Sequence, residues 1–265
     1  MTAAPAQQAV PLQSRRILGV RVDSTSYADA TQRIIAWAKQ RQSRYVCLAT
    51  VNNIMEAHDC LRYAEVLEQA DLVTSDGMPL VWMLRVLGLR DASRVYGPDL
   101  TQEILAAAER EQVTVGFYGG TDPLLTKLLS AIQQRDPKLQ IGFSEAPPFR
   151  PATLQEDQRT IRNIQSSKVQ VLFAGLGSTK QDKWMRAHRG QIDCVMLGVG
   201  AAFDYLAGAK SQAPHWMQRS GLEWLFRLAT EPRRLGRRYL KHNPRFVLLA
   251  LWQLLRGSGK GEPRT

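Results

Sequence analysis

Short apolar runs alternate with segments of helical periodicity over most of the chain. The runs are bounded by Gly, Asp, Asn or Thr, as buried strands usually are. They cover residues 17–22, 45–49, 70–75, 113–118, 139–143, 169–174 and 194–200. The helical segments between them cover 27–40, 54–69, 79–87, 99–110, a stretch from 123, 153–165 and a stretch around 184. Strands that alternate with helices form mostly parallel sheets covered on both faces. The pattern therefore predicts an α/β fold, a Rossmann-like mostly parallel sheet with helices on both faces.

The pattern changes near residue 213, where the strand signals stop. Three helices are predicted beyond it, over 214–229, 231–241 and 244–255. We therefore expect an α/β domain over 15–212 and a C-terminal helical appendage over 213–256. The ends of the chain, 1–14 and 257–265, are expected to be disordered arms.

Positive charge is concentrated in the appendage. The formal net charge is +11, and from Arg227 to the end ten Lys or Arg face only two acids. The spacing of Arg227, Arg234, Arg238, Lys241 and Arg245 predicts one basic helical face. An almost wholly apolar block follows at 246–255, too short to span a bilayer but long enough to lie in its interface.

Three partners could explain this basic and apolar tail. An anionic membrane surface bound through 227–256 is the interpretation we favour, because basic residues are attracted to anionic lipids. The first alternative is a helix packed on the core with its basic side in water. The second is nucleic acid, which is disfavoured because the charged and aliphatic blocks are separate.

The cysteine content and the N-terminus predict a cytosolic protein. Cys47, Cys60 and Cys194 have no spacing typical of a disulfide framework or a zinc site. The N-terminus lacks the basic and apolar regions of a signal peptide. No run reaches the ~18 apolar residues that a membrane span needs.

Asp76 stands where a strand is predicted to end and a helix to begin. It is followed by Gly77, a turn residue, and by Pro79, which suits the first turn of a helix. Ligands of α/β proteins bind in the crevice at such strand ends. The alternative is that Asp76 only closes a turn.

Three other predicted strand ends carry glycine-rich turns. They contain Gly119 and Gly120, Gly175 and Gly177, and Gly198 and Gly200. Backbone amides at such turns suit a phosphate or diphosphate. Glycine can also be required there for chain geometry alone.

Several well-known motifs are missing from the sequence. The dinucleotide fingerprint is not met, because Lys180 and Phe203 occupy the third glycine positions. There is no Gly-x-Ser-x-Gly elbow and no Walker phosphate loop. The four histidines lie far apart, and no Asp-x-Asp pair occurs to hold a divalent cation. We therefore expect no metal site.

Taken in order, several segments resemble the bacterial WecG/TagA/CpsF glycosyltransferases, which have the type-E glycosyltransferase fold. The matching segments lie at 50–52, 75–79, 94–97, 117–120, 175–181, 198–204 and 213–234. The resemblance implies an inverting, metal-independent transfer of a hexosyl unit from a UDP-sugar to a polyprenyl-diphosphate-linked sugar, with no cofactor. It points to N-acetylmannosamine, with glucose as the other candidate, and to exopolysaccharide or teichoic acid synthesis at the cytoplasmic face of the membrane.

The resemblance also implies roles for individual residues. Asp76 matches the general base, with Thr50 and Asn52 beside it. Residues matching the nucleotide-sugar pocket are Arg94, Gln181 and Asp204. Tail residues that would close over the diphosphate are Arg227, Arg234 and Arg237. One departure is Val51-Asn52-Asn53, where many members have Pro-Asn-Pro.

Two other classes of function stay open at the level of sequence. A Rossmann-like sheet could serve an NAD-type oxidoreductase, and calorimetric binding of UDP or of NAD would separate the two. A non-enzymatic membrane or nucleic-acid adaptor should bind neither nucleotide. A homo-oligomer also stays open at the level of sequence.

Overall fold

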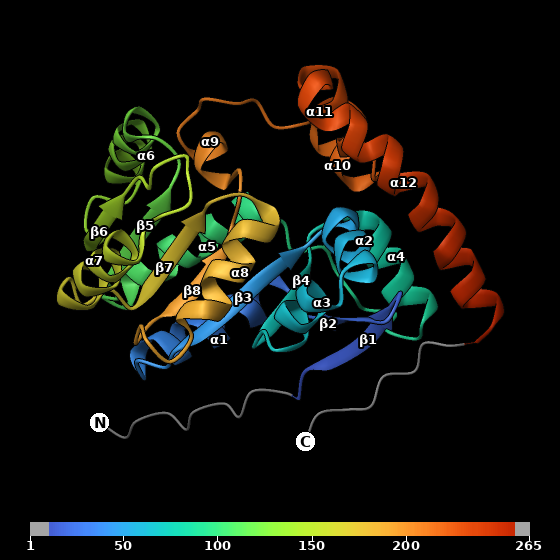
Figure 1. Cartoon of the computed structure of the whole chain (residues 1–265), viewed down its shortest axis with the longest axis horizontal. Helices are drawn as coiled ribbons and strands as arrows, with labels where there is room; N and C mark the ends of the chain where they lie inside the picture. Colours follow the sequence, from blue (N-terminus) through green and yellow to red (C-terminus); the bar gives the residue numbers. More distant parts are fainter. Residues whose placement is uncertain (1–10, 258–265) are drawn as a thin grey trace.

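The computed structural model describes residues 11–257 and shows the predicted α/β architecture (Figure 1). Most of the two expected arms, 1–10 and 258–265, lies outside the described residues. The first element, β1, begins at Gln13, inside the segment expected to be an arm.

A six-stranded parallel sheet forms the centre of the molecule, with the order β4-β3-β8-β7-β5-β6. Its strands are β3 (Arg44–Ala49), β4 (Leu72–Ser75), β5 (Val115–Gly119), β6 (Ile141–Glu145), β7 (Val171–Gly175) and β8 (Val195–Gly198). The chain runs outward from β3 to β4 and then crosses to the other half of the sheet. The reversal creates a crevice at the carboxyl ends of the strands, the usual ligand site of such sheets.

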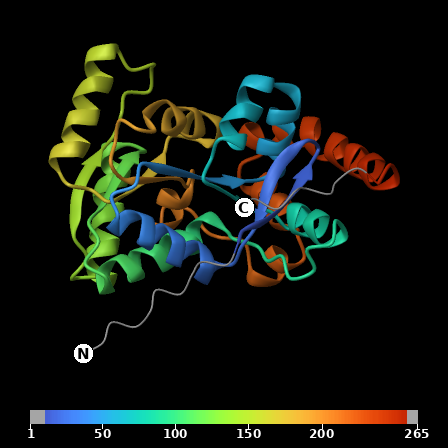
Figure 2. The same ribbon diagram turned by 90° about the horizontal axis from the view of Figure 1, so that it is seen from below.

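Helices cover both faces of the sheet, as predicted. One face carries α1 (Tyr27–Lys39), α5 (Gly97–Arg110), α6 (Asp122–Arg135) and α9 (Ala202–Leu206). The other carries α2 (Val51–Asp59), α3 (Leu61–Glu68), α4 (Met78–Val86), α7 (Leu154–Ser166) and α8 (Ser178–His188). Figure 2 shows the sheet between α1 and α5 on one side and α2 and α3 on the other. Alternate residues of β3 enter the two cores, Val46 and Leu48 on one face and Tyr45 and Cys47 on the other.

The strand predicted at 17–22 was wrong, because a turn interrupts it. An antiparallel hairpin is formed there by β1 (Gln13–Ile17) and β2 (Val20–Ser24). Leu18 and Gly19 make the turn, with φ of 50° and 85°. The buried carboxylate of Asp23 accepts a hydrogen bond from the N–H of Val73 at 2.7 Å. The hairpin thus covers the outer edge of β4, which would otherwise expose unpaired amides.

Helix boundaries differ from the prediction at several places. The helix expected over 54–69 is two helices, because Cys60 is extended between α2 and α3. The helix expected to begin at 99 begins at Gly97, the first residue of α5, whose N-cap is Tyr96.

The appendage is built from three helices: α10 (His215–Arg219), α11 (Glu223–Thr230) and α12 (Pro232–Leu255). The helix expected over 214–229 is broken at Gly221, whose φ is +73°. The two helices expected after 231 are one, because α12 continues through Pro244. Arg227 therefore belongs to α11 and does not share a helical face with the basic residues of α12.

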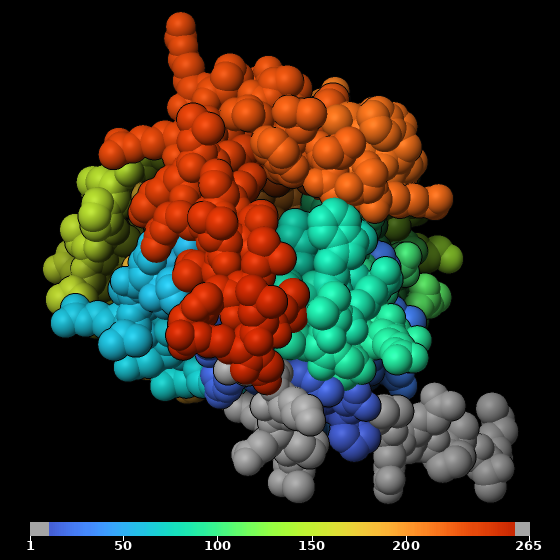
Figure 3. Space-filling model, turned by 90° about the vertical axis from the view of Figure 1, so that its right-hand side faces the viewer, coloured from blue at the N-terminus to red at the C-terminus, as the bar shows by residue number. Residues whose placement is uncertain are grey.

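One side of α12 packs on the α/β body (Figures 1 and 3). Phe246 and Ala250 are buried in the core beneath it. The Gln253 amide accepts from the N–H of Leu18 at 2.9 Å and donates to the carbonyl of Arg16 at 2.7 Å. Core packing therefore accounts for this side of the helix, whereas contact of the other side with a membrane stays a prediction. Within residues 11–257, no helix has the length and apolar character to cross a bilayer.

Candidate active site

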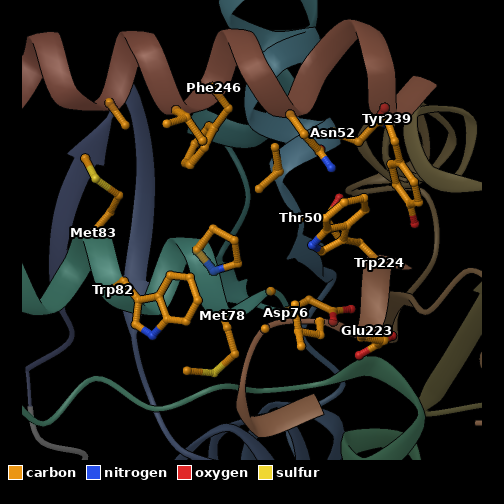
Figure 4. Close-up of a pocket in the computed structure, with 18 of the residues that line it drawn as sticks. Thr50, Asn52, Asp76, Met78, Trp82, Met83, Glu223, Trp224, Tyr239 and Phe246 are labelled. Atoms are coloured by element: carbon orange, nitrogen blue, oxygen red, sulfur yellow. The ribbon is translucent and has the colours of Figure 1, made fainter. Parts of the chain in front are cut away.

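A cavity of about 630 Å³ lies where the appendage meets the ends of β3 and β4. Its walls come from the turns after the two strands, from α4, and from α10, α11 and α12 (Figure 4). Of the residues predicted for the site, it brings together Thr50, Asn52, Asp76, Arg94 and Arg227. The appendage thus completes a pocket that the sheet alone would leave open.

Asp76 follows β4 directly and presents its carboxyl group to this cavity. Its own N–H donates to the carbonyl of Ala49 at 2.9 Å, which fixes the turn, and its side chain is 17% exposed. Burial raises the pKa of Asp76 to about 6, Arg94 opposes the rise, and the negative charge of Glu223 adds to it. Arg227 and the Gly97 N–H also lower this pKa. A carboxyl group with this pKa can exchange a proton near neutral pH.

Arg94 connects Asp76 to the appendage. The N–H of Val95 donates to the carbonyl of Ser75 at 2.9 Å, so the loop after α4 runs beside the end of β4. The Arg94 guanidinium lies 3.6 Å from the Asp76 carboxylate and donates a short hydrogen bond to the carboxylate of Glu223. One cation therefore lies between a carboxylate of the body and a carboxylate of α11.

Two arginines of the appendage also line the cavity, and each has a side-chain N–H group that is not used in a hydrogen bond to any described residue. The Nε–H groups of Arg227 and Arg238 are buried and have no hydrogen-bond acceptor among the described residues. A buried donor without a partner is costly, so an anionic ligand group would be stabilised beside them.

Thr50 is held in one orientation by a buried polar network. Its hydroxyl donates to Oδ1 of Asn53 at 2.7 Å, and the Asn53 amide donates to the Tyr63 hydroxyl at 2.7 Å. The Tyr63 hydroxyl donates in turn to Asp182 at 2.6 Å. Because the Thr50 proton is already used, the hydroxyl oxygen is available to the cavity as a hydrogen-bond acceptor. Asn52 adds a second acceptor, a buried Oδ1 with no partner among the described residues.

Other predicted site residues lie outside this cavity, at the neighbouring strand ends or on α12. Gly119 ends β5, where an added Cβ would lie 2.5 Å from the Gly175 backbone, so close packing alone requires glycine there. Gly120 follows it, and Gly177 is the N-cap of α8. The Gln181 side chain accepts from the N–H of Gly200 at 3.1 Å and holds the turn after β8. These residues lie at or next to the carboxyl ends of β5, β7 and β8, on the same edge of the sheet as Asp76.

Asp204, Arg234 and Arg237 also lie away from the cavity. Asp204 is 3.5 Å from Lys210, and Lys210 is 3.4 Å from Glu231. Glu231 pairs in turn with Arg234 at 2.6 Å. Arg237 is exposed on α12.

The structure adds cavity residues that the sequence did not single out for the site, chief among them Glu223, Arg238, Trp82, Trp224 and Tyr239. Glu223 and Trp224 lie within a segment that carried the family resemblance, and Arg238 lies within the basic run. The sequence lacked a signal for which side of α11 or α12 would face the body.

Known proteins that resemble this chain are similar over most of its length. Two relatives from Staphylococcus aureus, strains NCTC 8325 / PS 47 and MRSA252, are each named N-acetylglucosaminyldiphosphoundecaprenol N-acetyl-beta-D-mannosaminyltransferase. Each is 29% identical to this chain over 240 residues, which cover 87% of this chain and 89% of the relative. The names of these relatives give no support to the oxidoreductase alternative. The model of the glycosyl transferase WecG/TagA/CpsF family matches residues 15–260, and the chain belongs to this family of glycosyltransferases.

Proposed function

We propose that the protein transfers a hexosyl unit from a UDP-sugar to a sugar carried on a polyprenyl diphosphate. The configuration at the anomeric carbon of the transferred sugar is inverted. N-acetylmannosamine is the first candidate for the sugar, because the Staphylococcus relatives are named for it, and glucose is the second. The product would serve the synthesis of a surface polysaccharide. The observation that carries the proposal is the Asp76 carboxyl group in a cavity that also contains arginines.

Asp76 acts as the general base in this reaction. An inverting displacement needs a group that removes the proton of the acceptor hydroxyl as the new bond forms. With a pKa of about 6, Asp76 is ionised at neutral pH and basic enough to accept that proton. Thr50 and Asn52 present acceptor oxygens to the same cavity and would orient sugar hydroxyl or amide groups.

Arginine side chains stabilise the charge of the departing UDP. The diphosphate gains negative charge as the glycosidic bond breaks, and preorganised donors facing that charge lower the barrier by several kcal/mol. Arg227 has a buried Nε–H group available for this role. The family resemblance implies that the reaction needs no metal ion. The glycine turns after β5 and β7 would hold the rest of the nucleotide.

The enzyme would work at the cytoplasmic face of the membrane, attached peripherally to an anionic surface through 227–256. Supporting this, α12 carries exposed apolar side chains, with Leu248 68% and Leu255 87% exposed. Arg233 and Arg237 are exposed on the same helix. Binding to anionic vesicles should weaken as salt is added, because the attraction is screened.

The direct test is incubation with a panel of UDP-sugars and a synthetic polyprenyl-diphosphate sugar, followed by mass spectrometry. A product heavier by one hexosyl unit, formed in the presence of a chelator, is the expected result. Absence of product with every donor would refute the proposed function, and product only after addition of a divalent cation would refute its metal-independent form.

A further inference from the structure

One end of the cavity is polar and the other is apolar. Asp76, Glu223 and Tyr239 lie at one end in Figure 4, whereas Trp82 and Met83 lie toward the other, below Phe246 of α12. The apolar end is a groove between α4 and α12, seen as a hollow beside the long helix in Figure 3. Past Arg238, none of the described residues that line this groove has a charged side chain.

The two walls of this groove are stripes at helical spacing. On α4 the stripe is Met78, Trp82 and Val86, and on α12 it is Val247, Leu251 and Leu254. Several of these side chains are exposed although they face each other: Trp82 is 46% exposed, Val86 67% and Leu251 54%. Large apolar side chains left exposed in a contiguous groove usually mark a binding site.

The length and position of the groove narrow the choice of occupant. The lining runs from Arg238 to Leu254, which corresponds to about 24 Å along a helix. Arg238 lies at its polar end, where its unpaired Nε–H group suits a diphosphate. A ligand with a diphosphate at one end and a long flexible hydrocarbon chain at the other matches both ends of the cavity.

We infer that the groove between α4 and α12 holds the first isoprene units of a polyprenyl diphosphate. The inference rests on the proposed function only for the identity of the occupant. The diphosphate of this acceptor lies near Arg238, the sugar points toward Asp76, and the hydrocarbon chain leaves between Val86 and Leu254. By holding the hydrocarbon chain at one end of the acceptor, the groove positions the sugar at the other end so that its hydroxyl group lies beside Asp76.

The outer side of α12 provides a matched control. Leu248 is 68% exposed and does not line the groove, whereas Leu251, one turn away, is 54% exposed and does. Leu→Gln at either position removes the same apolar group from the same helix. If apolar ligands simply cover the outside of α12, as a bilayer would, both variants should weaken their binding. If the hydrocarbon chain lies in the groove, only Leu251→Gln should weaken its binding.

The test is the equilibrium binding of farnesyl diphosphate and of inorganic diphosphate, measured by calorimetry on the full chain without any sugar donor. Wild type should bind farnesyl diphosphate more tightly than inorganic diphosphate. Leu251→Gln should weaken farnesyl diphosphate binding about tenfold, as expected for loss of one buried leucine contact, without a matching loss for inorganic diphosphate. Leu248→Gln should bind both as wild type does.

Three results would overturn the inference. Farnesyl diphosphate binding no tighter than that of inorganic diphosphate would show that the groove does not hold the chain. Equal weakening by the two variants would assign these leucines to a general apolar surface. Self-association that Leu251→Gln abolishes, without selective farnesyl binding, would assign the groove to a second copy of the chain. Because no turnover is needed, a failure of sugar transfer in the mass-spectrometric test would be recognised separately.

Discussion

Replacing Glu223 by Gln should move the acid limb of the pH–rate profile to lower pH. Glu223 comes from α11, yet its carboxylate shares the Arg94 guanidinium with Asp76. Its negative charge raises the pKa of Asp76, after the larger effect of burial. Glutamine keeps the size of the side chain but removes the charge, and it leaves Arg94 free to pair more fully with Asp76.

The size of the shift follows from the distances. The Arg94 nitrogen that contacts Glu223 is 3.6 Å from the Asp76 carboxylate, so the two carboxylate oxygens lie within about 7 Å of each other. Two like charges at that distance repel by about 2 kcal/mol at an effective dielectric constant of ~20. Screening by the arginine between them reduces this value, and each pKa unit corresponds to about 1.4 kcal/mol. We therefore expect the pKa of Asp76 to fall by about one unit, from about 6 to about 5.

The assay is kcat/KM for sugar transfer measured from pH 4.5 to 8, because this quantity reports the pKa of the essential base in the free enzyme. Wild type should lose activity as the pH falls below about 6, since Asp76 becomes protonated there. Glu223→Gln should retain activity about one unit further into acid. Glu231→Gln, at another paired glutamate of the appendage that lies outside the cavity, is the control and should leave the limb in place. An acid limb that does not move in Glu223→Gln would refute this electrostatic coupling.

Three further outcomes follow from the same contacts. Asp76→Asn should raise the free energy of unfolding at pH 8 by up to about 3 kcal/mol in urea titrations, because the pKa of Asp76 in the folded state, about 6, exceeds the ordinary 3.8. Below about pH 4 the Asp76 carboxyl group is protonated in both the folded and the unfolded wild type, so the difference between wild type and variant should vanish. Thr50→Val should lower kcat/KM about tenfold, by loss of one hydrogen-bond acceptor, whereas Thr50→Ser should retain most of it. Gly175→Ala places a Cβ 2.7 Å from the Phe203 ring and should lower thermal stability by about 1–3 kcal/mol, whereas Gly236→Ala, with its nearest contact at 3.8 Å, should raise it by about 1 kcal/mol in calorimetry.

The strand–helix alternation was sufficient to predict the parallel sheet, because burial on both faces leaves continuous apolar runs in the sequence. The alternation did not predict one short turn or the course of the chain at one proline. Leu18-Gly19 was missed as a turn because both flanking segments are strands of one hairpin. Two helices were predicted over 231–241 and 244–255, but α12 continues through Pro244, with Phe246 and Ala250 anchored in the core.

The candidate site was predictable where it depends on the sheet and less so where it depends on the appendage. Asp76 could be placed from the Asp-Gly turn and the proline that follows. The resemblance assigned Arg237 to the diphosphate, whereas Arg238 lines the cavity, because the side that faces the body depends on how α12 is rotated. Glu223 illustrates the same limit, because its partner Arg94 is 129 residues away in the chain.

Sugar transfer by the proposed mechanism depends on the Asp76 carboxylate, which removes the proton from the acceptor hydroxyl. The most direct measurement is single-turnover sugar transfer by wild type and Asp76→Asn under saturating donor and acceptor, with the urea titration above confirming that the variant is folded. A rate lower by at least about a hundredfold at pH 8 is the predicted result. Transfer by Asp76→Asn at close to the wild-type rate would show that Asp76 is not the general base.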